Sequence, residues 1–524
     1  MAYSSSFVWK TVMPHSIHNS LSISLLLSTP QAMYIYPMKQ VIVIGAGIAG
    51  LATSIRLKVA GHHVQVVEAN DYPGGKLHAI QLGNYRFDAG PSLFTMPHYI
   101  DELFELCGEN PRAHFNYQKK DKVCHYFWQD GTSFVVDADP SRFVQEASYF
   151  FSESKDVIET YISRNEFKYR TTYPLFIERS LHKINSYLHR DVLKGIVSIP
   201  KLNLFSTLHE VNASYFSNPK LIQLFDRFAT YNGSSPFRTP GIMSMIPHLE
   251  MKLGTYFPEG GMHAITQSIY QLALRQGVEF LFGERAKKIH YSNNQVKGVQ
   301  TEFRYLPADI VVSNADVYTT YKQLLSELPM PQNIIKQVRS SSGLIFYWGI
   351  KKEFAQLGLH NIFFSTDYKQ EFEAIFQQKV IPSDPTVYIN ITSKDKADDA
   401  PSGAENWFVM VNAPANNGQD WSIQKEKTRK TILEKLSNIL QTDIASLIEV
   451  EEVLDPIKIE HNTSSYQGSL YGTSSNSRNA AFARQPNFST HIEDLYFCGG
   501  SVHPGGGIPL CLQSARIVSD LITS

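Results

Sequence analysis

The sequence has few cysteines and no cysteine motif. Only four occur among its 524 residues, and none belongs to a C-x-x-C pair. This spacing excludes the dithiol of a disulfide reductase and a cysteine-rich zinc site, and we expect no metal site. So few cysteines are typical of a reducing compartment. The expected location is therefore cytoplasmic.

Long apolar runs and an excess of one charge are also absent. No apolar run reaches the roughly 18 residues of a membrane-spanning helix. The net charge is −1 and there is no long basic run, so nucleic acid is not an expected partner. Charged residues make up 19%, below the usual ~25%, while aromatic residues reach 12%. This balance indicates a large apolar interior, either as ordinary core or as an apolar substrate cavity.

The stretch VIVIGAGIAG predicts a nucleotide-binding turn. Val41 to Ile44 is typical of a buried parallel strand, and Ile48 to Ala60 predicts a helix. Gly45, Gly47 and Gly50 lie between and within them at G-x-G-x-x-G spacing. Such glycines allow a tight turn, close backbone approach to a pyrophosphate and close helix–strand packing. The free N–H groups of the helix start favour a bound phosphate.

A carboxylate follows at the position that such a site needs. Val64 to Val67 predicts the second strand, and Glu68 stands at its end. A carboxylate there can accept hydrogen bonds from both ribose hydroxyls, and it would repel a 2′-phosphate. The segment therefore predicts a Rossmann-type unit and disfavours NADP.

The residues that follow favour FAD over NAD. Gly74-Gly75-Lys76 is a second glycine turn, and a predicted hairpin leads from it to Gly90-Pro91-Ser92. A flavin dinucleotide needs a second phosphate contact and a backbone lining for its ribityl chain. These two turns could supply both, and the alternative is that they are ordinary surface turns.

A second strand–glycine–helix unit lies near the other end of the chain. Leu495 to Cys498 predicts a buried strand, and Pro509 to Ile522 predicts an amphipathic helix. This helix start can close the same cofactor site. No second G-x-G-x-x-G occurs. We therefore expect electrons to leave the cofactor for a quinone, oxygen or another protein, and not for a dinucleotide on the same chain.

Motifs along most of the chain resemble the bacterial-type carotenoid (phytoene) desaturases, a branch of the FAD-dependent amine-oxidase-like flavoproteins. Within this family, Lys76 and Leu93 to His98 resemble the 1-hydroxycarotenoid 3,4-desaturase branch. Lys76 replaces an arginine and lacks its planar fork, which puts the bidentate phosphate contact of the family in doubt. The motifs are Val41 to Ser92, RFATYNGSSPF (227–237), IPHLEMKLGTYFPEGGMHAI (246–265), NIFFSTDY (361–368), DPTVYINIT (384–392), SYQGSLYGTSSN (465–476) and HPGGGIP (503–509).

The resemblance implies an α/β fold, α+β overall, in which a substrate domain of mixed sheet and helices is inserted into a Rossmann-type FAD-binding domain. The FAD domain is expected to be discontinuous and the substrate domain to come in two parts. Residues 1–37 are expected to be an upstream extension, with Met38 as the natural start, or a disordered segment. The expected FAD segments are 38–108, 250–316 and 480–524, and the expected substrate segments are 109–249 and 317–479.

The cofactor-binding residues are predicted from the glycine turns and, for the backbone near the adenine, from the resemblance. They are Gly45, Ala46, Gly47, Ala49, Gly50, Glu68, Ala69, Gly74, Gly75, Lys76, Gly90, Pro91, Ser92, Ala286, Gly499, Gly500, Gly507 and Ile508.

The implied reaction removes a hydride and a proton from adjacent carbons of a long polyene. Conjugation delocalises the developing positive charge, so positioning and exclusion of water matter more than a strong base. Candidate residues near the flavin are Arg227, Tyr231, Glu250 and His503. Arg227 and Glu250 could instead form a structural ion pair. His503 could bind the substrate hydroxyl or only a backbone carbonyl.

The expected function is FAD-dependent introduction of the 3,4 double bond into a 1-hydroxylated, long-chain carotenoid. The alternatives are a phytoene- or lycopene-type desaturase, a carotenoid isomerase and a non-enzymatic carotenoid-binding flavoprotein. Quinone or oxygen is the expected electron acceptor.

One stretch favours peripheral membrane attachment. Between Leu188 and Leu208 the residues Leu188, Val192, Ile196 and Ile199 fall on one helical stripe, which Pro200 interrupts. Leu202, Phe205 and Leu208 continue it, and Arg190 and Lys194 lie opposite. The two interpretations are insertion into a lipid interface and packing against the core.

Overall fold

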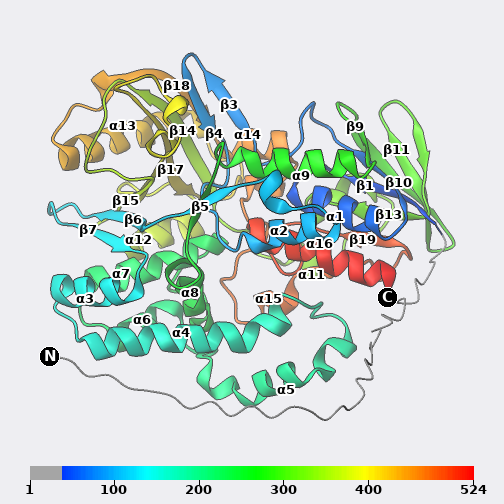
Figure 1. Cartoon of the computed structure of the whole chain (residues 1–524), viewed down its shortest axis with the longest axis horizontal. Helices are drawn as coiled ribbons and strands as arrows, with labels where there is room; N and C mark the ends of the chain where they lie inside the picture. Colours follow the sequence, from blue (N-terminus) through cyan, green and yellow to red (C-terminus); the bar gives the residue numbers. More distant parts are fainter. Residues whose placement is uncertain (1–37) are drawn as a thin grey trace, which may run out of the picture. The chain divides into compact units, whose positions relative to one another are not determined.

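A five-stranded parallel sheet forms one half of the fold (Figure 1). The structure is a computed structural model and describes residues 38–524, so the expectations for residues 1–37 fall outside it. The strand order is β19-β13-β1-β2-β9, which confirms the predicted Rossmann-type core. The strands are β1 (Gln40–Ile44), β2 (His63–Val67), β9 (Glu279–Leu281), β13 (Ile310–Ser313) and β19 (Leu495–Phe497).

Both faces of this sheet are covered, because its strands are apolar on both sides. In β1, Val41 and Val43 pack against four helices, while Ile42 and Ile44 pack against a small antiparallel sheet. The helices are α1 (Ile48–Val59), α2 (His98–Leu106), α9 (His263–Arg275) and α16 (Ile508–Thr523), and the small sheet is β10 (Ala286–Ser292), β11 (Gln295–Thr301) and β12 (Tyr305–Pro307).

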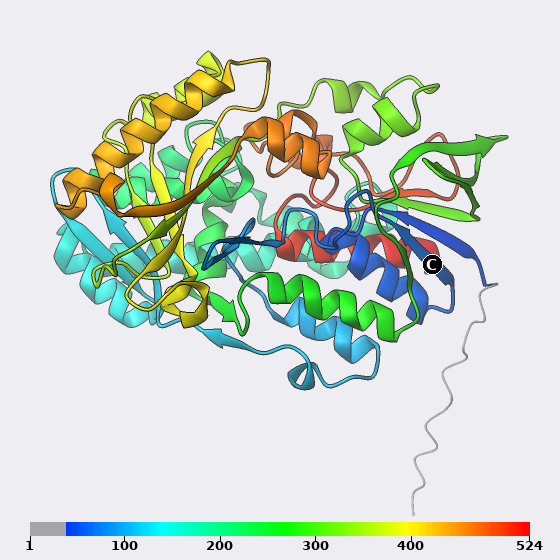
Figure 2. The ribbon, with the colours of Figure 1, turned by 90° about the horizontal axis from the view of Figure 1, so that it is seen from above.

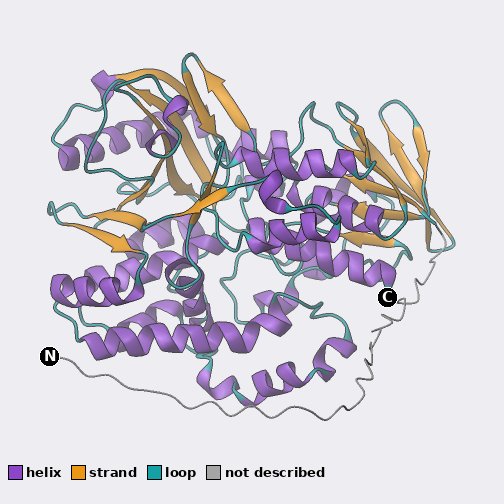
Figure 3. Ribbon diagram, in the orientation of Figure 1, coloured by secondary structure: helices purple, strands orange, loops and turns teal. Residues whose placement is uncertain are grey.

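A seven-stranded mixed sheet forms the other half (Figure 3). Its order is β18-β14-β17-β16-β15-β6-β7, and only the β15–β6 pair is parallel. Leu344 and Phe346 of β14 belong to the core beneath helix α13 (Trp421–Leu440), whereas Ile345 and Tyr347 face the opposite side. The strands are β6 (Lys122–Phe127), β7 (Ser133–Asp137), β14 (Ser342–Ile350), β15 (His360–Phe363), β16 (Val387–Ile391), β17 (Glu405–Ala413) and β18 (Ile448–Leu454).

Helices from the middle of the chain pack beside β6 and β7 in a third, aromatic-rich core. The sheets draw their strands from the separate segments on which the expected domain division rests, and the boundaries of that division stay a prediction. The remaining elements are α3 (Pro140–Phe151), α4 (Lys155–Phe176), α5 (Arg190–Val197), α6 (Leu208–Tyr215), α7 (Pro219–Asp226), α8 (Ile246–Met251), α10 (Val317–Thr319), α11 (Gln332–Ile335), α12 (Tyr368–Glu373), α14 (Pro456–Thr463), α15 (Ala480–Ala483), β3 (Ala79–Leu82), β4 (Tyr85–Asp88), β5 (Tyr117–Lys119) and β8 (Tyr256–Pro258).

The single apolar stripe expected between Leu188 and Leu208 is wrong. The segment is broken into α5 and short 3₁₀ turns, and Val192, Leu202 and Leu208 point into the core. Leu188, Ile196, Ile199 and Phe205 are exposed instead. Turns before and after α5 rotate the helical phase, so part of the stripe packs inward and the rest faces outward. Within residues 38–524, no helix has the length and apolar character to cross a bilayer.

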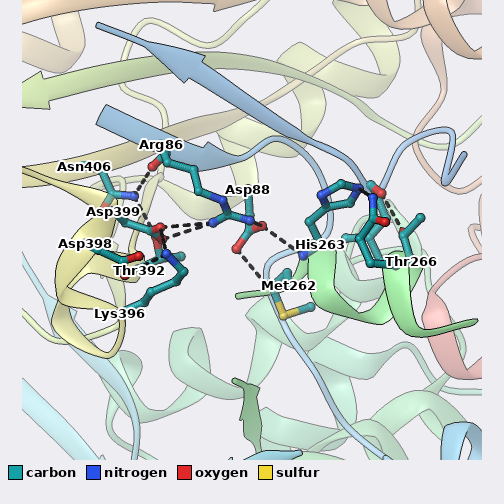
Figure 4. Close-up of polar contacts among 12 residues, drawn as sticks. Arg86, Asp88, Met262, His263, Thr266, Thr392, Lys396, Asp398, Asp399 and Asn406 are labelled. Atoms are coloured by element: carbon teal, nitrogen blue, oxygen red, sulfur yellow. Dashed lines mark hydrogen bonds and ion pairs between the residues drawn. The ribbon is translucent and has the colours of Figure 1, made fainter. Parts of the chain in front are cut away.

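The hairpin β3–β4 lies between the two sheets and is fixed by buried charges (Figures 2 and 4). The Asp88 carboxylate accepts hydrogen bonds from the backbone N–H groups of Met262 (2.7 Å) and His263 (2.9 Å), at the start of α9. Arg86 donates to Asp88 (2.8 Å) and to Asp399 (3.2 Å), beside the seven-stranded sheet. Burial alone would lower the pKa of Arg86, but the two carboxylates have the larger effect and raise this pKa. The hairpin therefore ties the two halves together.

We expect Asp88→Ala to destabilise the fold by about 3–5 kcal/mol, because it leaves the start of α9 without its carboxylate and Arg86 with only one of its two partners. Urea unfolding followed by circular dichroism measures the change. Asp398→Ala is the matched control, because the Asp398 side chain is 80% exposed and pairs with Lys396 at the surface. Equal midpoints for the two variants would contradict the anchoring role.

Candidate active site

A cavity of about 500 Å³ runs from the carboxyl edge of the parallel sheet to the open face of the seven-stranded sheet. Of the predicted cofactor residues, Ala46 in the first glycine turn and Gly50 in α1 do not line it. The others all line the cavity: Gly45, Gly47, Ala49, Glu68, Ala69, Gly74, Gly75, Lys76, Gly90, Pro91, Ser92, Ala286, Gly499, Gly500, Gly507 and Ile508. The folded chain thus brings together three segments that are far apart in sequence.

Glu68 organises the first glycine turn. Its carboxylate accepts hydrogen bonds from the backbone N–H groups of Ala46 (2.7 Å) and Asn70 (2.9 Å). Burial raises the pKa of this carboxyl, and the N–H bonds oppose that shift. The side chain also lines the cavity. It thus holds both sides of the turn and faces the cavity, and its contact with a ribose stays a prediction.

Close packing requires glycine in this turn. A Cβ at Gly50 would lie 2.1 Å from the carbonyl oxygen of Gly45, a contact that backbone atoms cannot relieve locally. Gly74 N–H donates to the carbonyl of Ala46 (2.8 Å), so the two glycine turns form one surface. Helix α1 starts at this surface without a side-chain cap. Its free N–H groups therefore suit an anionic ligand.

Lys76 connects the second turn to the substrate side. Its Nζ donates to the backbone carbonyls of Ser469 (3.1 Å) and Leu470 (2.9 Å). Burial lowers the pKa of Lys76 to about 8. The ammonium group of a lysine can make both carbonyl contacts, so they do not need the planar guanidinium of an arginine. A contact between Lys76 and a cofactor phosphate stays a prediction.

The segment after β13 also lines the cavity, and sequence reasoning missed it. Asn314 lies against Gly45, Gly47 and Gly50, and its Nδ2 donates to the Gly45 carbonyl (3.3 Å). Asp316 lies two residues further along the same wall. A usable signal existed, because Ile310 to Val312 is an apolar run typical of a buried strand and ligands bind outside the carboxyl ends of parallel strands.

Arg227, Tyr231 and Glu250 meet on the cavity wall. Arg227 Nη2 donates to Glu250 (2.6 Å), Arg227 Nε donates to Tyr126 (2.5 Å), and the Tyr231 hydroxyl donates to Glu250. Burial alone would lower the pKa of Arg227, but the carboxylate outweighs it and holds this pKa well above its ordinary value. Burial also raises the pKa of Tyr231 far above its usual range. The cluster therefore supplies a fixed ion pair and a neutral phenol.

His503 lies outside the cavity lining. Its Nε2 is 2.8 Å from the carbonyl oxygen of Arg179, and its ring packs edge-on against His182. Burial lowers the pKa of His503 to about 4, so the imidazole is neutral near pH 7. Of its two expected partners, a backbone carbonyl is the one present in the structure.

The open face of the seven-stranded sheet forms the far wall, which sequence reasoning did not locate. Side chains from adjacent strands line it side by side: Cys124 from β6, His360 and Ile362 from β15, Tyr388 from β16, Phe408 and Met410 from β17, Ile345 from β14 and Leu454 from β18. Most are apolar. The arrangement provides a wall suited to a hydrocarbon beside the nucleotide-binding edge.

The class of protein follows from this fold and site. Residues 48–523 match the flavin containing amine oxidoreductase family, so the chain belongs to that family and is a flavin-dependent oxidoreductase. It is 57% identical over 485 residues to the 1-hydroxycarotenoid 3,4-desaturase of Flavobacterium sp. (strain P99-3), covering 93% of this chain and 99% of the relative. It is 30% identical over 511 residues to the phytoene desaturase of Fusarium fujikuroi, covering 92% and 89%.

Solved structures agree with the fold. An oxidoreductase from Methanosarcina mazei superposes with a TM-score of 0.61 at 16% identity, covering 93% of this chain and 100% of that one. Wild-type putrescine oxidase bound to putrescine gives 0.61 at 13% identity, covering 93% and 99%. The predicted amine-oxidase-like flavoprotein fold is therefore confirmed.

The residues present fit a flavin dinucleotide. Helices α1 and α16 both start at the cavity without a side-chain cap, and two anionic phosphates suit such starts. Glu68 suits a ribose, and the Gly90-Pro91-Ser92 turn separates these polar features from the apolar wall. In the part of the chain that the structure describes, no cluster of three or more metal-binding side chains occurs.

Gly50→Ala tests the cofactor turn. We expect the affinity for flavin to fall more than about tenfold, or about 1.4 kcal/mol, because the methyl group displaces the Gly45 carbonyl. Flavin absorbance per protein after gel filtration measures this loss. Val59→Ala, at the other end of α1, is the control, because the Val59 side chain is 40% exposed. Full flavin content in Gly50→Ala would show that the turn tolerates a side chain.

Proposed function

We propose that the protein is an FAD-dependent carotenoid 3,4-desaturase acting on a 1-hydroxylated carotenoid. The observation that carries the proposal is that one cavity joins the dinucleotide-binding edge of the parallel sheet to the apolar wall of the seven-stranded sheet. The relative of 57% identity, named as a 1-hydroxycarotenoid 3,4-desaturase, supports the substrate class. FAD, and not FMN, is favoured because the glycine turns suit a second phosphate and Glu68 suits the ribose of the adenosine part.

Bound flavin supplies an acceptor for the hydride that leaves one carbon of the new double bond. The chain's own residues hold the polyene against the apolar wall and exclude water from it. The Arg227–Glu250 ion pair and the neutral Tyr231 phenol form a fixed polar part of the wall beside the cavity. A proton leaves the adjacent carbon, and quinone or oxygen is the proposed final acceptor of the two electrons.

A substrate comparison tests this function. The purified protein, with FAD and liposomes, receives a 1-hydroxylated carotene or phytoene, and products are followed by chromatography and absorption. We expect a red-shifted product from the hydroxylated carotene only. Conversion of phytoene instead would favour the phytoene-type alternative. Binding of pigment without reduction of flavin in the absence of oxygen would favour a binding protein.

We also propose that the protein attaches to the surface of a membrane, where a long-chain carotenoid resides. We define the α5 surface as the exposed apolar residues Leu188, Leu193, Ile196, Val197, Ile199 and Phe205. Val197 is 82% exposed and Phe205 is 76% exposed. Arg190 and Lys201 are exposed in the same segment. A row of apolar side chains with basic neighbours suits an interface with anionic lipid.

Liposome flotation tests the α5 surface. Ile196→Asp combined with Phe205→Asp is expected to weaken binding to anionic liposomes by roughly 100-fold, because each side chain contributes about 1.5 kcal/mol or more on insertion. Ile423→Asp combined with Ile457→Asp is the control, because these isoleucines are exposed on α13 and α14. Flotation of both double variants like the unaltered protein would disprove this attachment.

A further inference from the structure

His360 has one satisfied and one unsatisfied nitrogen. Its Nδ1 lies 2.7 Å from the Tyr388 hydroxyl and 3.3 Å from Asn390 Nδ2. Its Nε2 is buried and has no hydrogen-bond partner within the described chain. The side chain is only 3% exposed, yet it lines the cavity. A buried polar atom without a partner costs about 1–3 kcal/mol, so a ligand that pairs with it gains that amount.

Three other polar residues around this wall, Arg227, Tyr231 and Thr386, already have partners. Arg227 and Tyr231 are bound to Glu250, as described above. Thr386 donates to Glu371 (2.6 Å) and lies 3.3 Å from the hydroxyl of Ser365. Burial lowers the pKa of His360 to about 3, so its ring is neutral near pH 7. Neutral imidazole offers either a donor or an acceptor at Nε2, and a hydroxyl group can pair with both.

The position of His360 agrees with the chemistry of the proposed substrate. The Tyr388 hydroxyl that binds His360 also hydrogen-bonds to Ser92 (2.8 Å), in the turn predicted to contact the flavin. In a 1-hydroxylated carotene a single carbon separates the hydroxyl-bearing C1 from C3, one end of the bond to be oxidised. The hydroxyl group must therefore bind close to the reacting carbons. Asn412 is another polar residue of the wall and lies two residues after Met410 on β17. Met410 pairs with Tyr388, the residue that binds Ser92.

We propose that His360 Nε2 binds the hydroxyl group of the substrate, with Tyr388 and Ser92 holding the ring in place. This inference rests on the proposed function and names the residue that distinguishes a hydroxylated carotenoid from a hydrocarbon. A hydrocarbon end would leave Nε2 without a partner, whereas the hydroxyl group of a tertiary alcohol can pair with it.

Two variants of His360 separate its nitrogens. His360→Asn keeps an amide near Nδ1 and removes the nitrogen at Nε2, whereas His360→Gln carries an amide near Nε2. We expect His360→Asn to lower kcat/KM for the 1-hydroxylated carotene about 5- to 150-fold relative to the same carotene without the hydroxyl. His360→Gln should retain most of the preference. Binding to the flavin-loaded protein in detergent, read from quenching of tryptophan fluorescence, should show the same order.

Three outcomes would overturn the inference. An equal loss for both carotenes in His360→Asn would indicate a structural role only. An unchanged preference in that variant, with a lost preference in Asn412→Leu, would move the hydroxyl group to the other end of the wall. If the unaltered protein oxidises phytoene and not the hydroxylated carotene, the proposed function is wrong. The inference that His360 binds the substrate hydroxyl group is then wrong as well.

Discussion

The geometry of the active site depends on where the hairpin β3–β4 is held. Its last residue, Asp88, binds the start of α9 in one half of the molecule, and its Arg86 binds Asp399 in the other. The Gly90-Pro91-Ser92 turn follows directly, and Ser92 meets Tyr388 of the seven-stranded sheet. One short, charge-anchored segment thus sets the distance between the cofactor edge and the substrate wall. A shift of either anchor would change that distance, on which a hydride transfer depends steeply.

The cofactor edge could be predicted from the sequence because its signals are local. A strand, three glycines and a helix stand within twenty or so residues, and their spacing alone requires a turn that approaches a phosphate closely. The same logic found the second unit before α16. Asn314 was missed because no spacing rule identifies the residue that fills the gap between two glycine turns.

The substrate wall could not be predicted in this way, since its residues come together only through long-range strand pairing. His360 and Tyr388 lie 28 residues apart and meet because β15 and β16 pair antiparallel. The alternation of side chains along β14 shows that one face of this strand packs into the core. It does not show that the other face borders a cavity. The exposed part of the α5 segment was likewise misjudged, because turns before and after the helix change which side chains face outward.

The two histidines show why partners matter more than residue type or sequence context. His503 stands in the HPGGGIP motif that resembles the desaturase family, yet its Nε2 already has the Arg179 carbonyl as a partner. His360 stands in an unremarkable strand, and its Nε2 has none. In a cavity of low polarity, an unpaired nitrogen raises the free energy of the empty site. A hydroxyl group that binds to this nitrogen lowers the free energy again. Selectivity for an alcohol over a hydrocarbon can thus come from a single side chain, while the apolar wall contributes most of the binding to both.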